Sequence, residues 1–235
     1  MSFQVSPLYR EKHAHLKVDS SKVLQSIAAQ HLLPVLVGEI IRVAGDLPVL
    51  FVKHSATGQF ELVALTSLEA GKNLLLKDGQ WQGMYLPRTV RNHPLALMED
   101  ANNSEQLLIA LIESSPALNA VQGNALFNSD GSDSDYLKQK SEALTQVFHG
   151  MQLTKAFCQQ LAELNLLQPQ TLKVMMAGQP QEIQGLYCID EQRLNQLSDS
   201  EFNALKDSHA LPAIYAHLMS LQQLQRLSLL HASAG

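Results

Sequence analysis

The side chains best suited to chemistry lie in one run, residues 81–94, which places two aromatic residues and two arginines between hydrophobic segments. Trp81 and Tyr85 could supply flat apolar walls. Arg88 and Arg91 follow three residues apart, so on a helix their guanidinium groups could converge on one carboxylate. The predicted ligand-binding site, which would hold an acidic peptide or a small acid, consists of Trp81, Tyr85, Arg88 and Arg91.

The same run allows a purely structural interpretation. Aromatic residues next to prolines usually pack, so Trp81 and Tyr85 would fill a seam between a sheet and a helix. Arg91 would then pair with an internal acid such as Glu39, which stands in an otherwise apolar helical segment and needs a partner if it is buried. Without such a partner, Glu39 could instead act as a general acid or base.

Metal binding is not predicted. His13 and His15 are two residues apart, so on a strand both imidazoles would face one side, but the sequence offers no evident third ligand. The acidic loop 127–135 lacks the spacing and the closing glutamate of a calcium-binding EF-hand, and we expect it to be solvated.

Catalytic residues cannot be nominated from motifs. The sequence contains no GxSxG, Walker-type, GxGxxG or HExxH pattern. Cys158 and Cys188 stand in a helical and a strand pattern, without CxxC spacing, which indicates reduced core thiols. We therefore expect no cofactor and favour a protein that is not an enzyme.

Composition limits the classes of partner that we expect. The 235 residues are 46% hydrophobic and carry a formal net charge of -5, with the basic residues scattered, so nucleic acid is not an expected partner. The apolar runs fall short of the roughly 20 residues that span a bilayer, and no secretory leader pattern is visible. We expect a cytoplasmic protein without a membrane span, possible protein or peptide partners, and an oligomeric state that the sequence does not indicate.

Hydrophobic periodicity predicts an α+β fold, with antiparallel hairpin sheets and a largely helical C-terminal half. In the first half we expect helices at 20–30 and 35–44, strands at 47–52 and 60–65, a turn at Asp78-Gly79, a short helix at 87–92, and a hairpin of 95–98 with 106–112. In the second half we expect a long helix from 136 to 166, a hairpin of 172–176 with 183–188, and helices at 190–197, 200–208 and 211–229.

A polar, acidic loop separates the two halves. It begins at Phe127 and precedes the long helix. We therefore predict an N-terminal α+β half at residues 1–126 and a helix-rich C-terminal half at residues 127–235, packed together as one compact unit. The helix at 211–229 should pack its apolar face on the hairpin of residues 172–188.

An ordered set of short motifs spans nearly the whole chain and resembles the bacterial SapC-like family. The motifs are His13-Ala14-His15-Leu16, Pro34-Val35 with Glu39, 48–52, Gly58-Gln59-Phe60 with 63–65, 85–94, 125–127 with Asp130-Gly131, Thr154-Lys155-Ala156-Phe157, Gly185-Leu186-Tyr187 with 189–191, and 214–218 with Ser220-Leu221.

The resemblance implies an association, by name, with bacterial surface layers (S-layers) and genes near TonB-dependent receptors, halogenase-like flavoproteins and cupin-like proteins. We therefore expect an accessory or binding protein of a surface-layer or uptake system that binds a protein, a peptide or a small acidic ligand. An alternative is an enzyme, or an enzyme's partner, linked to oxygenase or halogenase chemistry. A self-assembling surface-layer component is a third possibility, which the missing leader pattern disfavours.

Overall fold

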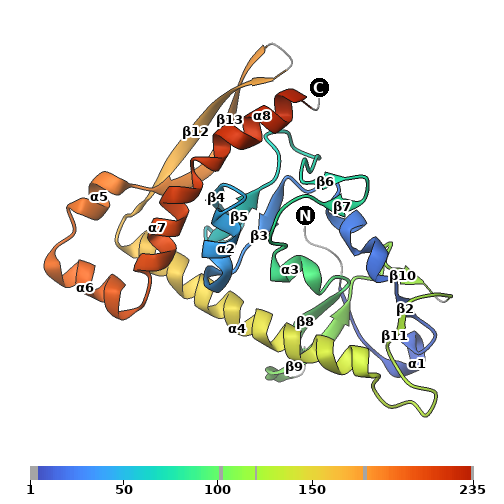
Figure 1. Cartoon of the computed structure of the whole chain (residues 1–235). Helices are drawn as coiled ribbons and strands as arrows, with labels where there is room; N and C mark the ends of the chain where they lie inside the picture. Colours follow the sequence, from blue (N-terminus) through green and yellow to red (C-terminus); the bar gives the residue numbers. More distant parts are fainter. Residues whose placement is uncertain (1–4, 101–102, 120, 177–178, 234–235) are drawn as a thin grey trace. The chain divides into compact units, whose positions relative to one another are not determined.

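The computed structural model describes residues 5–100, 103–119, 121–176 and 179–233 (Figure 1). Helices and antiparallel strands are mixed, and the C-terminal half is largely helical, which confirms the α+β prediction. The chain forms two compact units, each built from two separate segments. The first contains residues 1–28 and 88–149, and the second contains residues 29–87 and 150–235. The boundary predicted between residues 126 and 127 lies inside the first unit.

The first unit contains two small antiparallel sheets, ordered β1-β9-β8 and β10-β2-β11. Its core consists mainly of leucine side chains from several elements, including Leu95, Leu111, Leu126 and Leu137. Its elements are β1 (Ser6–Pro7), α1 (Arg10–His13), β2 (Lys17–Val18), the 3-10 helix η1 (Ser20–Ile27), α3 (Arg88–Arg91), β8 (Leu95–Asp100), β9 (Asn103–Leu111), β10 (Leu118–Asn119), β11 (Asn124–Ala125) and the first part of α4 (Asp135–Glu163).

The first unit tests several sequence predictions. The hairpin β8–β9 and the short helix α3 are confirmed. The helix predicted at 20–30 is the 3-10 helix η1, and Asp19 caps it, because its carboxylate accepts the Ser21 N–H. The strand assumed for the two histidines is wrong: His13 lies in α1 and is buried, whereas His15 lies in the exposed turn after it.

The second unit is organised around a five-stranded antiparallel sheet, ordered β12-β13-β4-β5-β3. Its elements are β3 (Leu32–Pro34), η2 (Val37–Glu39), α2 (Ile40–Ala44), β4 (Val49–Lys53), β5 (Phe60–Leu65), β6 (Leu76–Lys77), β7 (Gln80–Trp81), the last part of α4, β12 (Leu167–Met176), β13 (Gln179–Ile189), α5 (Glu191–Asn195), α6 (Asp199–Asp207), α7 (Leu211–Ser220) and α8 (Gln223–Ser233).

The centre of this sheet is covered on both faces. Val49, Leu50 and Phe51 are consecutive residues of β4, so their side chains point alternately to the two faces, and all three are fully buried. The helices α2 and α7 lie side by side (Figure 1), and Phe157 of α4 packs its ring 6.2 Å from that of Phe51. A central strand enclosed in this way tolerates no polar side chain without a partner.

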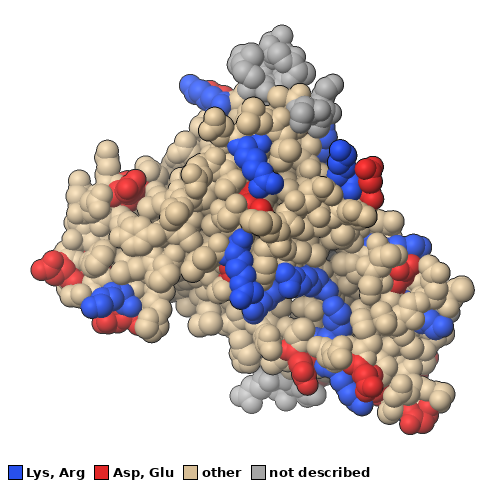
Figure 2. Space-filling view, viewed as in Figure 1, with Lys and Arg blue, Asp and Glu red and all other residues tan. Residues whose placement is uncertain are grey.

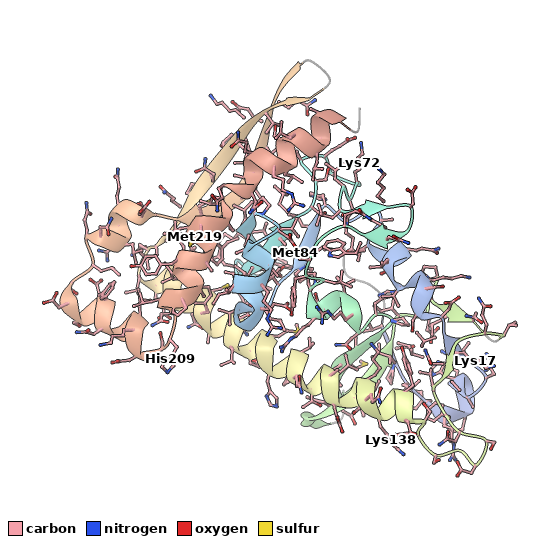
Figure 3. All side chains as sticks on the ribbon, in the orientation of Figure 1. Lys17, Lys72, Met84, Lys138, His209 and Met219 are labelled. Carbon is pink, nitrogen blue, oxygen red and sulfur yellow. The ribbon has the colours of Figure 1, made fainter. Side chains whose placement is uncertain are left out.

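The C-terminal helical prediction needs two corrections. The segment 211–229 is two helices, α7 and α8, which meet at a turn around Leu221. The packing on the hairpin is confirmed, since α7 contacts β13 and α8 contacts β12. Not every large apolar residue of α7 packs, however, since Tyr215 is 48% exposed and Met219 is 67% exposed. Met219 is labelled in Figure 3, and in Figure 2 the surface around α7 consists mostly of uncharged residues.

The helix predicted at 35–44 also starts later than expected. Leu32–Pro34 is the edge strand β3, which pairs with β5, and the helical turns begin only at Val37. Thr154 of α4 holds this start, because its hydroxyl accepts the Val37 N–H at 2.9 Å and donates to the Gly150 carbonyl. A Cβ at Gly150 would lie 2.8 Å from Leu36 Cδ1, so a larger residue here would displace the end of the Leu36 side chain.

A buried histidine joins α7 to the sheet. His217 is fully buried, its Nδ1 lies 2.8 Å from the Val49 carbonyl, and its Nε2 accepts the Ile189 N–H at 3.1 Å. The Ser220 hydroxyl accepts the Val49 N–H at 2.9 Å. Because Nε2 accepts a hydrogen bond, the ring is neutral, with its proton on Nδ1. Burial lowers the pKa of His217 from 6.5 to about 4.

We predict that acid destabilises the protein through this histidine. Because the folded pKa lies below 6.5, the unfolded chain binds the proton more tightly, so stability is lost as the pH falls from about 6.5 to about 4. The full loss is on the order of 3 kcal/mol. Denaturant unfolding at pH 7 and pH 4.5 measures it.

His217→Gln is the control, since it removes the titrating group while His93, whose pKa burial also lowers to about 4, stays in both proteins. The variant should lose less stability between the two pH values than the parent. An identical pH dependence in the two proteins would contradict the assignment to His217.

Candidate functional site

Trp81 closes the loop that follows β7. Its Nε1–H donates to the Tyr85 carbonyl at 3.2 Å. A Cβ at Gly83 would lie 2.7 Å from Trp81 Nε1, so the backbone passes directly against the indole and admits only glycine there. The Trp81 ring also packs against the core of the second unit. These are the contacts of a packed side chain, which is what the structural interpretation assigns to Trp81.

Tyr85 is the hydrogen-bond donor to the buried glutamate. Its side chain is 8% exposed, and its hydroxyl donates to Glu39 Oε2 at 2.8 Å, while Glu39 Oε1 accepts the Leu36 N–H at 3.1 Å. The Arg42 guanidinium lies 5.6 Å from the centre of the Tyr85 ring. Glu39 was predicted to pair with Arg91. Glu39 belongs to the second unit and Arg91 to the first, and that pairing stays a prediction.

Asp46 fixes the backbone beside Tyr85. Its carboxylate, 4% exposed, accepts the backbone N–H groups of Met84 and Tyr85, and Arg226 Nη1 lies 3.4 Å from its Oδ1. The loop therefore has a rigid backbone, yet the Met84 side chain is 86% exposed (Figure 3). Met84 is the apolar tip of an anchored loop.

The two arginines lie on one short helix, as their spacing predicts. Arg88 and Arg91 are the end residues of α3, and the Lys140 ammonium donates to the Arg91 carbonyl at 2.6 Å, which ties α3 to α4 within the first unit. The aromatic pair, Trp81 and Tyr85, belongs to the second unit. A joint ligand-binding site of these four residues stays a prediction.

We predict that Tyr85→Phe lowers the free energy of unfolding by about 1–3 kcal/mol, because Glu39 loses a hydroxyl donor inside the core. Met84 belongs to the same loop, but its side chain is exposed. Met84→Ala should therefore change the free energy of unfolding by less than about 0.5 kcal/mol. Urea unfolding of both variants and the parent decides this. Equal stability of Tyr85→Phe and the parent would show that the hydrogen bond contributes nothing.

A pocket of about 670 Å³ lies within the second unit, away from the predicted motif. Its lining comes from the last part of α4, the β4–β5 hairpin, β13, the first residue of β12 and the loop before it. The lining residues are Lys53, Gly58, Gln59, Phe60, Lys155, Cys158, Gln159, Ala162, Asn165, Leu167 and Tyr187.

The pocket combines an aromatic wall with two cations. Phe60 and Tyr187 meet edge to face, with ring centres 5.0 Å apart. The Lys53 ammonium lies 5.3 Å from the centre of the Phe60 ring, within cation–π range. Lys155 enters from α4, one residue after Thr154, whose hydrogen bond to Val37 fixes this stretch of helix.

Several polar groups of the lining have no protein partner. Among the described residues, Lys53 and Lys155 make no ion pair, and the side chains of Gln59, Asn165 and Tyr187 make no hydrogen bond. Donors that a folded protein leaves unused inside a concave surface are available to a ligand. Two of these donors are positively charged, which favours an anion.

The thiol in the pocket is not an activated nucleophile. Burial, with a smaller contribution from the nearby Glu61 carboxylate, raises the pKa of Cys158 to about 12, so the thiol stays protonated at neutral pH. Cys158 therefore offers the ligand an apolar surface. Cys188 is also free and buried, as predicted, and burial raises its pKa to about 11.

Sequence reasoning missed this pocket, although a signal for it was present. Three of the short motifs that carry the family resemblance, Gly58-Gln59-Phe60, Thr154-Lys155-Ala156-Phe157 and Gly185-Leu186-Tyr187, each contribute lining residues. They are far apart in the sequence. The sheet pairing of β13 with β4 and of β4 with β5 brings two of them together, and α4 supplies the third.

The fold and the pocket define an α+β protein with a basic, aromatic-lined cavity in its second unit. The SapC family model matches residues 8–227, nearly the whole chain, and the protein belongs to the SapC family. No curated protein and no solved structure matches it.

Two further features of the described residues bear on the predicted partners. In this part of the chain, no helix is long and apolar enough to cross a bilayer. Nor do three or more His, Cys, Asp or Glu side chains of these residues gather as a metal ion would require.

Proposed function

We propose that this SapC-family protein is a binding protein without catalytic activity, and that the pocket of the second unit holds a small acidic ligand. The observation that supports this most directly is the pair of lysines, Lys53 and Lys155, which line one concave surface without a carboxylate partner among the described residues. The ligand class agrees with the small acid expected from the sequence, while the site differs from the predicted motif.

The two ammonium groups of the pocket favour an anion over a neutral ligand. Both lysines are exposed, so in water each attracts an anion only weakly. A ligand that fills the pocket displaces the water between them and lowers the local dielectric constant, which strengthens both attractions. The adjoining amide and phenol groups can complete the hydrogen bonds of a carboxylate.

The lining also supports binding rather than chemistry. Its cysteine is held protonated, and its other functional groups are ammonium, amide and phenol groups that orient a ligand. We further propose that the protein acts in the cytoplasm, as an accessory component of a surface-layer or uptake system, where it passes the ligand to, or senses it for, a protein partner. The family association by name and the two free thiols support this setting.

Lys53→Ala and Lys155→Ala test the pocket, with isothermal titration of a small carboxylate panel consisting of succinate, glutarate and naphthalene-2-carboxylate. We predict that each variant weakens binding of the carboxylates that bind by about tenfold, as expected for a charge-assisted contact. Raising the salt concentration should weaken binding to the parent as well.

The matched control is Lys206→Ala, which removes an exposed lysine of α6 in the same unit, outside the pocket. It should leave every affinity unchanged. The proposal is rejected if no carboxylate binds, or if all three lysine variants behave alike.

A further inference from the structure

We infer that the ligand of the pocket is a monocarboxylate with a flat apolar body, such as an aryl carboxylate, and that Lys53 anchors its charged end. This inference rests on the proposed function and narrows it, because it specifies the shape and the charge of the acid. Three independent features of the pocket carry it: the aromatic wall, the position of Lys53 and the acidic surroundings.

The aromatic wall specifies a flat apolar body. Phe60 and Tyr187 are each half-buried, both line the pocket, and their rings meet edge to face. Leu167, Ala162 and the protonated thiol of Cys158 extend the apolar lining. A flat ring placed here can contact these aromatic and apolar groups, and aromatic contacts add about 0.5–1.5 kcal/mol beyond area burial.

Lys53 connects the charge to that wall. Lys53 and Phe60 are directly opposite each other in the β4–β5 ladder, and the ammonium lies 5.3 Å from the ring centre. A carboxylate bound to this ammonium therefore places its own substituent beside the aromatic rings. A short, fully polar diacid would fill only the cationic end and leave the rings in contact with water.

Two carboxylates near the pocket disfavour a second negative charge on the ligand. The α4 residues of the pocket lie in the last turns of the helix, which ends at Glu163, and this end carries the negative part of the helix dipole. Glu163 accepts a hydrogen bond from the lining residue Gln159 at 2.8 Å, and the Glu61 carboxylate acts on Cys158. These negative charges would repel a phosphate dianion, whereas the two lysines can neutralise the single charge of a carboxylate.

The experiment compares four probes by isothermal titration on the full chain: naphthalene-2-carboxylate, its uncharged amide, succinate and phenyl phosphate. We expect naphthalene-2-carboxylate to bind at least tenfold more tightly than each of the other three. Succinate or phenyl phosphate binding as tightly, with the same dependence on Lys53 and Lys155, would overturn this inference and leave the proposed acid-binding function standing. Binding of none of the anions would overturn both.

Three variants test the wall separately from the charge. Phe60→Leu should weaken naphthalene-2-carboxylate by about fivefold and leave the weaker succinate affinity unchanged. Tyr187→Phe keeps the ring and should retain the selectivity between the two probes. Phe202→Leu, on the exposed face of α6, is the control and should change neither affinity. Selectivity that survives Phe60→Leu would contradict the role of the aromatic wall.

Discussion

The second unit depends on the hydrogen bonds that the backbone of its central strand forms. Val49 begins β4 inside the core, and both its N–H and its carbonyl contact α7, through Ser220 and His217. The same imidazole accepts the N–H of Ile189 at the end of β13, so one side chain joins a helix to two strands. Around these contacts, the sheet aligns the β4–β5 hairpin with β13 and thereby builds the aromatic wall of the pocket.

The elements that the sequence predicts well are those with strong local signals. The strand Phe60–Leu65 was predicted with the observed bounds, and the Asp78-Gly79 turn joins β6 to β7 as expected. Apolar runs and Asp-Gly pairs are signals that lie within a few residues. The long helix α4 was also found from its periodicity. The errors arise where tertiary contacts decide. Residues 32–34 precede a predicted helix, but their pairing with β5 makes them a strand.

The candidate site shows the same division. The helical spacing of Arg88 and Arg91 is a local property, and it was predicted correctly. Glu39 was recognised as a buried acid in need of a partner, yet its donor, the Tyr85 hydroxyl, comes from a loop whose path depends on Asp46 and on the contact of Gly83 with Trp81. The pocket depends on sheet register between distant segments, which periodicity does not encode.

The discontinuity of the two units has a consequence for how the chain is made. β4 and β5 leave the ribosome early, but their neighbour β13 and the helix that supplies His217 come from the last quarter of the sequence. At ordinary rates of synthesis the central strand waits on the order of ten seconds for these partners. Throughout that interval an apolar strand exposes an unpaired edge, the type of surface on which nascent chains aggregate or recruit chaperones. Production of this protein in the cell should therefore depend strongly on the speed of translation through residues 88–149, which lie in the sequence between the two segments of the second unit.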